Sequence, residues 1–198
     1  TQIKGKERLE SVVISQVDDN RNPIPGTETE YPCDTLILSV GLIPENELSL
    51  SAGAELDRGS NGPVVDEHHQ TTVPGIFAAG NVLQVHDLVD FVSAEAEELA
   101  DSAAAYLQAG SLSECRLQVL TDGSVTHAVP RKISGEADFT LSFRVRKPAK
   151  NCRIRLVQGG ETVFEKKMAK AIPAEMIQIP VKASWLKKNE DLEVKMEW

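Results

Sequence analysis

Apolar and polar residues alternate strictly along three segments near the end of this 198-residue chain, at residues 139–145, 177–181 and 192–198. A period of two puts one set of side chains on a buried face and the other in water, as in antiparallel sheets. Gly159 and Gly160 separate two further strand-like segments and predict a hairpin turn. The pattern predicts a small β-sandwich of immunoglobulin-like size. Its expected strands cover residues 116–120, 125–129, 139–145, 152–157, 162–167, 176–181 and 192–198.

The charge balance changes sharply near residues 110–113. Residues 1–111 contain 5 Lys and Arg against 19 Asp and Glu, a net charge of -14, whereas residues 112–198 contain 16 against 11, a net charge of +5. Such a break predicts two domains, 1–111 and 112–198. The positive charge of the second is spread over alternating strands. We therefore interpret it as a solvated face and expect no nucleic-acid partner.

The first of these regions has short unbroken apolar runs instead of alternation. Residues 1–19 predict a β-hairpin remnant, and a turn is expected at residues 18–23. The apolar runs at residues 35–40 and 75–79 predict strands that are buried on both faces, as in a parallel sheet. Together with a following helix, these strands favour an α/β architecture.

That helix is expected over residues 92–107, where the sequence is rich in alanine. Asp90 or Ser93 is the candidate N-cap, and Gly110 is the expected stop. Leu99, Ala103 and Leu107 recur every four residues and predict one apolar face. The acidic residues of the helix are expected to form its wet face, namely Glu95, Glu97, Glu98 and Asp101.

Two segments point to a ligand. The apolar run in residues 35–44 ends in Gly41 with Pro44 three residues later, and the run in residues 72–81 ends in Gly80 with Asn81 directly after it. A glycine at the end of a parallel strand lets a ligand approach the backbone closely. A polar side chain after it can bind a sugar-like hydroxyl, and the N-terminus of a following helix attracts an electron-rich group.

Both segments, in this order and separation, resemble the FAD-domain signatures of the two-dinucleotide-domain flavoproteins, the FAD-dependent pyridine-nucleotide-disulfide oxidoreductases. The resemblance covers about residues 1–108. It implies that FAD lies at Gly80 and Asn81 through its ribityl chain, and at the backbone around Phe91 and Val92 through its pyrimidine ring. It also implies NAD(P) as a second cofactor of the parent protein. The family usually has Asp where this chain has Asn81, which can bind a hydroxyl but carries no charge.

The resemblance therefore implies a partial Rossmann-like FAD/NAD(P)-binding domain followed by the β-sandwich. The glycine-rich turn G-x-G-x-x-G that holds the pyrophosphate in such domains occurs nowhere in the 198 residues. We expect the chain to be a C-terminal part of a flavoprotein oxidoreductase, to bind FAD weakly or not at all alone, and to have the upstream half of the same protein or a partner subunit as its partner. The catalytic residues are unknown, because the flavin carries the redox chemistry.

Several alternatives stay open at this point. The chain could be a non-catalytic interaction or oligomerisation module in which the β-domain binds a partner subunit, and a homo-oligomer is compatible with the sequence. His86 and Asp87 could instead transfer a proton at the flavin edge. We assign no metal site, because the adjacent His68 and His69 lie in a polar loop where histidines are usually solvated.

The cysteines and the hydropathy bear on the compartment. Cys33, Cys115 and Cys152 are far apart and form no C-x-x-C pair. An odd number of cysteines without a framework fits a reducing compartment. No apolar run approaches the length of a membrane span. We therefore expect a cytoplasmic protein.

Overall fold

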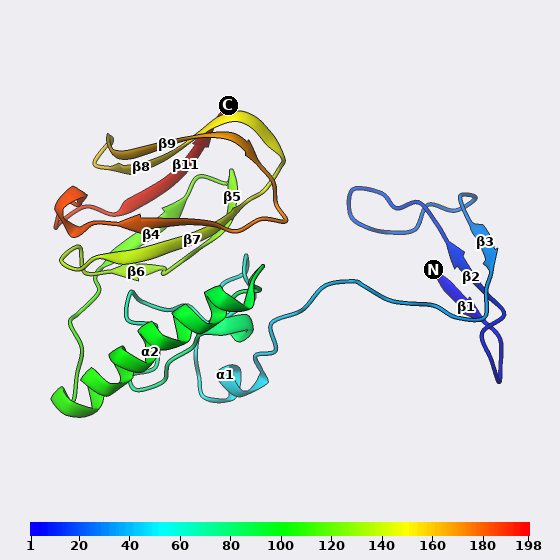
Figure 1. Ribbon diagram of the computed structural model, residues 1–198, viewed down its shortest axis with the longest axis horizontal. Coiled ribbons are helices and arrows are strands. Elements are labelled where there is room, and N and C mark those ends of the chain that lie inside the picture. Colours follow the sequence, from blue (N-terminus) through cyan, green and yellow to red (C-terminus); the bar gives the residue numbers. More distant parts are fainter. The chain divides into compact units, whose positions relative to one another are not determined.

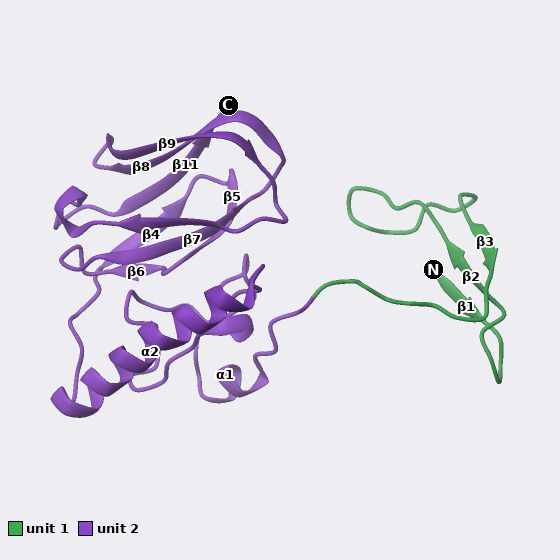
Figure 2. Cartoon of the chain, viewed as in Figure 1, with its two compact units in different colours: residues 1–41 green, residues 42–198 purple.

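The computed structural model describes all residues, 1–198, and contains more strands than helices. The chain divides into two compact units, Thr1–Gly41 and Leu42–Trp198 (Figure 2). No helix in the structure has both the length and the apolar character that crossing a bilayer requires.

The first unit is a three-stranded antiparallel sheet. Its strands are β1 (Gln2–Lys4), β2 (Ser11–Ile14) and β3 (Thr29–Pro32), in the order β1-β2-β3. The predicted hairpin is confirmed by the pairing of β1 with β2. The predicted turn is also present, because Asp18 Oδ1 accepts the backbone N–H groups of Asn20 and Asn22 at 2.9 and 2.8 Å.

The predicted buried strand at residues 35–40 is wrong. These residues form no strand, and Ile37 and Val40 are 87% and 86% exposed. A buried parallel strand needs a neighbour on each edge and cover on both faces. None of the described residues pairs with this segment, so its apolar side chains meet water. Residues 75–79 also form no strand, and their one pairing is an isolated bridge between Gln70 and Phe77.

The second unit begins with a loop-rich part that carries two helices. They are α1 (Glu47–Ser51) and α2 (Val89–Ala109), and the short 3-10 helix η1 (Gly80–Val82) precedes α2. The helix α2 starts three residues earlier than predicted, at an N-cap residue, Leu88, that offers no side-chain cap. Its predicted end is confirmed, because Gly110 adopts φ +76° and donates its N–H to Tyr106 O at 2.8 Å.

The apolar face of α2 is shorter than predicted. Leu99 and Ala103 are half-buried, but Leu107 is 83% exposed. The expectation that Glu95 lies on the wet face is wrong, since Glu95 is the buried residue of the helix. Glu97, Glu98 and Asp101 are exposed, as predicted.

Residues 117–197 form two sheets (Figure 1). The three-stranded sheet has the order β10-β7-β5 and is antiparallel, with β5 (Val125–Val129), β7 (Phe139–Val145) and β10 (Ile177–Val181). The five-stranded sheet has the order β6-β4-β11-β8-β9, and only its β4–β11 pair is parallel. Its strands are β4 (Leu117–Thr121), β6 (Lys132–Ile133), β8 (Ala149–Gln158), β9 (Glu161–Ala171) and β11 (Leu192–Glu197).

The side chains at the predicted alternating positions pack between the two sheets and join them. Alternate residues of β7, β10 and β11 are buried in one core cluster, and both sheets contribute to it. These residues are Phe139, Leu141, Phe143, Val145, Ile177, Ile179, Val181, Leu192, Val194 and Met196. The hairpin turn between β8 and β9 is confirmed, with Gly159 and Gly160 at φ +55° and +80°. All seven predicted strands are present, whereas β6 has only two residues and left no pattern in the sequence.

The predicted boundary between 111 and 112 stays a prediction, because the loop-rich part and the two sheets lie within one compact unit. Specific bonds link them. The Arg144 guanidinium on β7 donates to Val85 O at 2.8 Å and pairs with Asp87, and the other oxygen of Asp87 accepts the Met176 N–H at 2.6 Å. The two parts are therefore tied by a partly buried ion pair.

We expect residues 112–198, expressed alone, to unfold in one cooperative thermal transition, because their core cluster is complete without the loop-rich part. The midpoint should lie below that of the full chain, since the bonds of Arg144 to Val85 and Asp87 are lost. Circular dichroism during heating measures both. A fragment without a cooperative transition would show that the two-domain division is wrong.

We also expect stability to depend on the titration of His127. Burial lowers the pKa of this imidazole from 6.5 to about 4. The folded protein therefore leaves His127 neutral where the unfolded chain protonates it, so the free energy of unfolding should fall as pH drops from about 6.5 toward 4. The upper limit for one such group is roughly 3 kcal/mol. Denaturant unfolding at a series of pH values should show this slope reduced in His127→Gln, and an unchanged slope would contradict the assignment.

Candidate functional site

The segment after residue 79 brings the predicted ligand-binding residues to the start of α2. Gly80 is buried and adopts φ +73°, which a residue with a side chain rarely does. A Cβ atom at this position would lie 3.3 Å from Val92 Cγ1. Gly80 and Val92 are therefore neighbours in space, as the cofactor assignment requires.

A buried carboxylate holds this turn. Glu95 Oε2 accepts the Gly80 N–H at 2.5 Å, and Glu95 Oε1 accepts the side-chain amide of Gln84 at 3.1 Å. His86 Nε2 lies 3.3 Å from Glu95 Oε1 in ion-pair distance, although its direction is outside that of a hydrogen bond. One side chain of α2 thus fixes three positions of the loop before it.

The charge of Glu95 is stabilised despite its burial. Burial itself acts to raise the pKa of this carboxyl group. The imidazole of His86, the Gly80 N–H and the Gln84 amide together outweigh burial, so the pKa of Glu95 lies below its ordinary value. The group therefore stays ionised near neutral pH.

Two buried polar side chains beside Glu95 have nitrogen or oxygen atoms without a hydrogen-bond partner. The His86 side chain is 1% exposed, and its Nδ1 has no hydrogen-bond partner. Gln84 Oε1 is also buried without a partner. Unsatisfied buried atoms are costly and mark places where a proton or a ligand group can be received. The proton-transfer role considered for His86 remains a prediction.

The remaining predicted residues differ in their surroundings. Asn81 is exposed, and its Oδ1 accepts the His86 N–H at 3.1 Å, which leaves its amide N–H groups for another acceptor. The Phe91 N–H donates to Leu88 O at 3.2 Å. Because α2 begins at Val89, its positive end lies in residues 89–92, next to Gly80.

The Phe91 side chain lines a cavity of about 510 Å³. Gly80, Asn81 and Val92 do not line this cavity, which lies between α2, residues 66–69 and the strands β7 and β10. Its walls are strongly acidic, with six carboxylates, Asp66, Glu67, Glu95, Glu98, Asp101 and Asp138, against the ammonium group of Lys182. Such a cavity favours cationic over anionic occupants.

The cysteines supply no redox pair within the chain. Cys33, Cys115 and Cys152 are all free. Burial, followed by the carboxylates of Glu67 and Asp66, raises the pKa of the Cys115 thiol to about 12. A thiol with so high a pKa is a poor nucleophile at neutral pH.

Sequence reasoning missed Glu95 and Gln84. A usable signal was present for Glu95, because it precedes Leu99 by four residues and so continues the apolar face of the helix. A carboxylate on such a face is buried and must find donors. No comparable signal existed for Gln84, whose burial depends on the path of the loop.

Comparison with known proteins gave matches over this same part of the chain. The family model described as pyridine nucleotide-disulphide oxidoreductase matches residues 6–106. The chain is 32% identical over 83 residues to a probable ferredoxin reductase, CtmF, of Castellaniella defragrans, which covers 40% of this chain and 20% of that protein.

Two further relatives match shorter stretches of the chain. Putidaredoxin reductase CamA of Pseudomonas putida is 43% identical over 58 residues, covering 29% of this chain and 13% of that protein. A thioredoxin reductase of Listeria monocytogenes is 37% identical over 78 residues, covering 39% and 22%. The chain thus spans about a fifth or less of the length of these relatives.

We expect Glu95→Ala to lower the free energy of unfolding by about 3 kcal/mol, because it leaves the Gly80 N–H and the Gln84 amide buried without an acceptor. Glu97→Ala, on the exposed side of the same helix, should change it by less than about 0.5 kcal/mol. Urea unfolding measures both. Equal effects of the two substitutions would show that Glu95 does not hold the loop.

The charge of Glu95 adds a pH dependence. Its pKa is lowered in the folded protein, so the stability it contributes is present above the ordinary value of 4.5 and is lost as pH falls below it. Glu95→Gln, which keeps one acceptor oxygen, should therefore show a shallower loss of stability in acid than the unmodified chain.

Proposed function

Because this chain belongs to the pyridine nucleotide-disulphide oxidoreductase family, we propose that residues 1–111 are the C-terminal part of the nucleotide-binding region of a flavin-dependent oxidoreductase. Members of the family are flavin oxidoreductases that use FAD and NAD(P). The observation that carries the proposal is the buried Gly80 with positive φ, placed against the first turn of α2 inside the matched region.

The residues around Gly80 fit the sugar-like part of FAD. A Cβ atom at residue 80 would lie 3.3 Å from Val92 Cγ1, a tight contact, and φ is +73°, so glycine suits the close packing of this turn against α2. The exposed amide of Asn81 can donate to a ribityl hydroxyl. The N-terminus of α2, without a side-chain cap, favours an electron-rich oxygen such as that of the flavin pyrimidine ring near Phe91 and Val92.

The whole protein would move electrons between a nicotinamide or small organic substrate and an acceptor, with bound FAD supplying the electron transfer. All three relatives described above are reductases, which supports this assignment. The residues of this chain would position the cofactor: Gly80 and Asn81 at the ribityl chain, and Glu95 by holding the turn that carries them. The negative charge of Glu95 would hold the Gly80 N–H and the His86 imidazole in position.

We also propose that residues 112–198 are an accessory β-sandwich of immunoglobulin-like size. Two sheets whose alternate side chains share one core support this assignment. The family match ends at residue 106, before the first of these strands, which supports a separate role for this part. Its contacts with residues 85 and 87 support a role next to the proposed cofactor-binding loop.

The test is a titration of the purified chain with FAD, followed by flavin fluorescence. We expect a colourless protein and weak, substoichiometric quenching, because no glycine-rich turn is available to bind the pyrophosphate. At high FAD concentration, Asn81→Ala should weaken the residual binding by about 2–10-fold through loss of one hydrogen bond. Gly80→Val should weaken it further, because its side chain meets Val92.

Lys166→Ala on the exposed face of β9 is the matched control and should bind FAD as the unmodified chain does. Tight stoichiometric binding would overturn the incomplete-site proposal and make the chain a cofactor-binding protein by itself. Binding that is unchanged by both Gly80→Val and Asn81→Ala would show that the cofactor lies elsewhere.

A further inference from the structure

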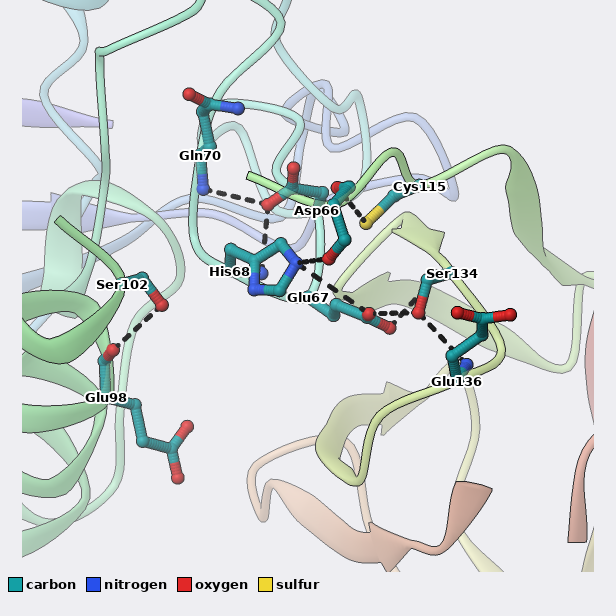
Figure 3. Close-up of polar contacts among 10 residues, drawn as sticks. Asp66, Glu67, His68, Gln70, Glu98, Ser102, Cys115, Ser134 and Glu136 are labelled. Atoms are coloured by element: carbon teal, nitrogen blue, oxygen red, sulfur yellow. Dashed lines mark hydrogen bonds and ion pairs between the residues drawn. The ribbon is translucent and has the colours of Figure 1, made fainter. Parts of the chain in front are cut away.

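Three potential metal-binding side chains that are not among the residues assigned to the cofactor meet in the second unit. A carboxylate oxygen of Glu67, a ring nitrogen of His68 and the sulfur of Cys115 all lie within 4.8 Å of one another. Figure 3 shows Glu67 and His68 on one loop, with Cys115 approaching from the segment that leads into β4. We propose that these three side chains bind a divalent transition-metal ion, with Zn²⁺ as the best match.

The donor set is what favours zinc. One oxygen, one imidazole nitrogen and one thiolate sulfur form a mixed set that suits a borderline-soft ion and does not suit Mg²⁺ or Ca²⁺, which prefer oxygen alone. Bond lengths of about 2.0–2.3 Å in a tetrahedral site place ligand atoms roughly 3.5 Å apart. The three atoms need only small side-chain movements to reach that spacing. A water molecule would take the fourth position, because His68 and Cys115 are only partly buried.

The loop is shaped in advance for this arrangement. Asp66 Oδ1 accepts the backbone N–H groups of His68 and Gln70 at 2.9 and 3.0 Å, which fixes the turn that carries Glu67 and His68. This turn points both side chains to one side, where His68 Nε2 lies 3.9 Å from Glu67 Oε1. Preformed ligand geometry lowers the ordering cost of binding.

A second contact orients the carboxylate. The Glu67 side chain is 1% exposed, and Ser134 donates to it through both its backbone N–H and its hydroxyl (Figure 3). Hydrogen bonds of this kind hold a ligating carboxylate in one rotamer while it keeps a lone pair for the metal. Ser134 lies just after β6, so the five-stranded sheet supports the site from one side.

His68 has a different partner in the metal-free protein. Its Nε2 lies 2.7 Å from the hydroxyl of Ser113, two residues before Cys115. Binding of the metal would replace this bond and displace the thiol proton of Cys115. The consequence is a cross-link between the loop at residues 66–70 and the segment that joins α2 to β4. No metal site was predicted here, because His68 and His69 lie in a polar loop; Cys115 is 47 positions from His68 in the sequence.

The test uses Co²⁺ as a spectroscopic probe and Zn²⁺ as its competitor, with the full 198-residue chain and a non-thiol reductant. We expect about one equivalent of Co²⁺ to produce a sulfur-to-cobalt charge-transfer band, which Zn²⁺ then removes. Zn²⁺ alone should raise the thermal midpoint of unfolding. Cys115→Ser should abolish the band, and His68→Asn should weaken binding by more than about 100-fold, since even supporting residues are worth about 10–100-fold.

Two variants make the test specific. Cys33→Ser removes a partly buried thiol outside the cluster and should leave the band and the affinity unchanged. Ser134→Ala keeps all three ligands but frees the Glu67 carboxylate, so it should weaken binding by about 10–100-fold while the band remains. Circular dichroism of each variant, compared with the unmodified chain, confirms that it is folded.

The proposal is overturned by a chain that gives no charge-transfer band, by a band that persists in folded Cys115→Ser, or by a band that disappears in Cys33→Ser. A Zn²⁺-dependent rise in thermal midpoint that is the same in unmodified chain and in His68→Asn would overturn it as well. None of these outcomes depends on FAD, so the result is independent of the proposed oxidoreductase function.

Discussion

In the loop-rich part of the second unit, carboxylates accept backbone N–H groups and fix the path of the chain, a role that sheet hydrogen bonds have in other folds. Its apolar cluster is small, with Val65, Ala78 and Leu83 from this part and Val129 from β5. Asp57, Asp66 and Glu95 each accept N–H groups from neighbouring turns, and the turns at residues 57–60, 66–70 and 80–86 depend on them. Because charged acceptors form stronger hydrogen bonds than neutral ones, a few side chains can order a long stretch of irregular backbone. The negative charge of residues 1–111 is thus partly structural.

The same type of interaction connects the loop at residues 80–87 with the two sheets. Asp87 and Val85 flank His86, and both are held by Arg144 of β7. The position of the His86 imidazole beside Glu95 therefore depends on a strand about sixty residues further along the chain. These bonds fix the backbone of residues 85–87 in the loop that leads into α2. The sheets thus help to position the loop around His86 through Arg144 and Met176.

The sequence predicted the strands of residues 117–197 well, because strict alternation of apolar and polar residues indicates a half-buried strand and Gly159 and Gly160 indicate a hairpin turn. It also predicted the end of α2 at Gly110 and the proximity of Gly80 to the following helix. The runs at residues 35–40 and 75–79 were not formed as strands, since a buried strand depends on neighbours that no local pattern supplies. The burial of Glu95 was missed because a glutamate is usually exposed. The cluster around Cys115 was missed because its residues lie far apart in the sequence.

The exposed apolar segment at residues 36–43 has a consequence for the behaviour of the chain in solution. Ile37, Leu38, Val40 and Ile43 are largely in contact with water, and the backbone around them is unpaired. An extended segment of this kind can add to the free edge of a sheet in another molecule, which is the first step of aggregation. Gly41 and Pro44 interrupt the segment and limit the length of any such pairing. The residues of the first glycine-terminated segment are therefore also an exposed apolar edge that another molecule can pair with.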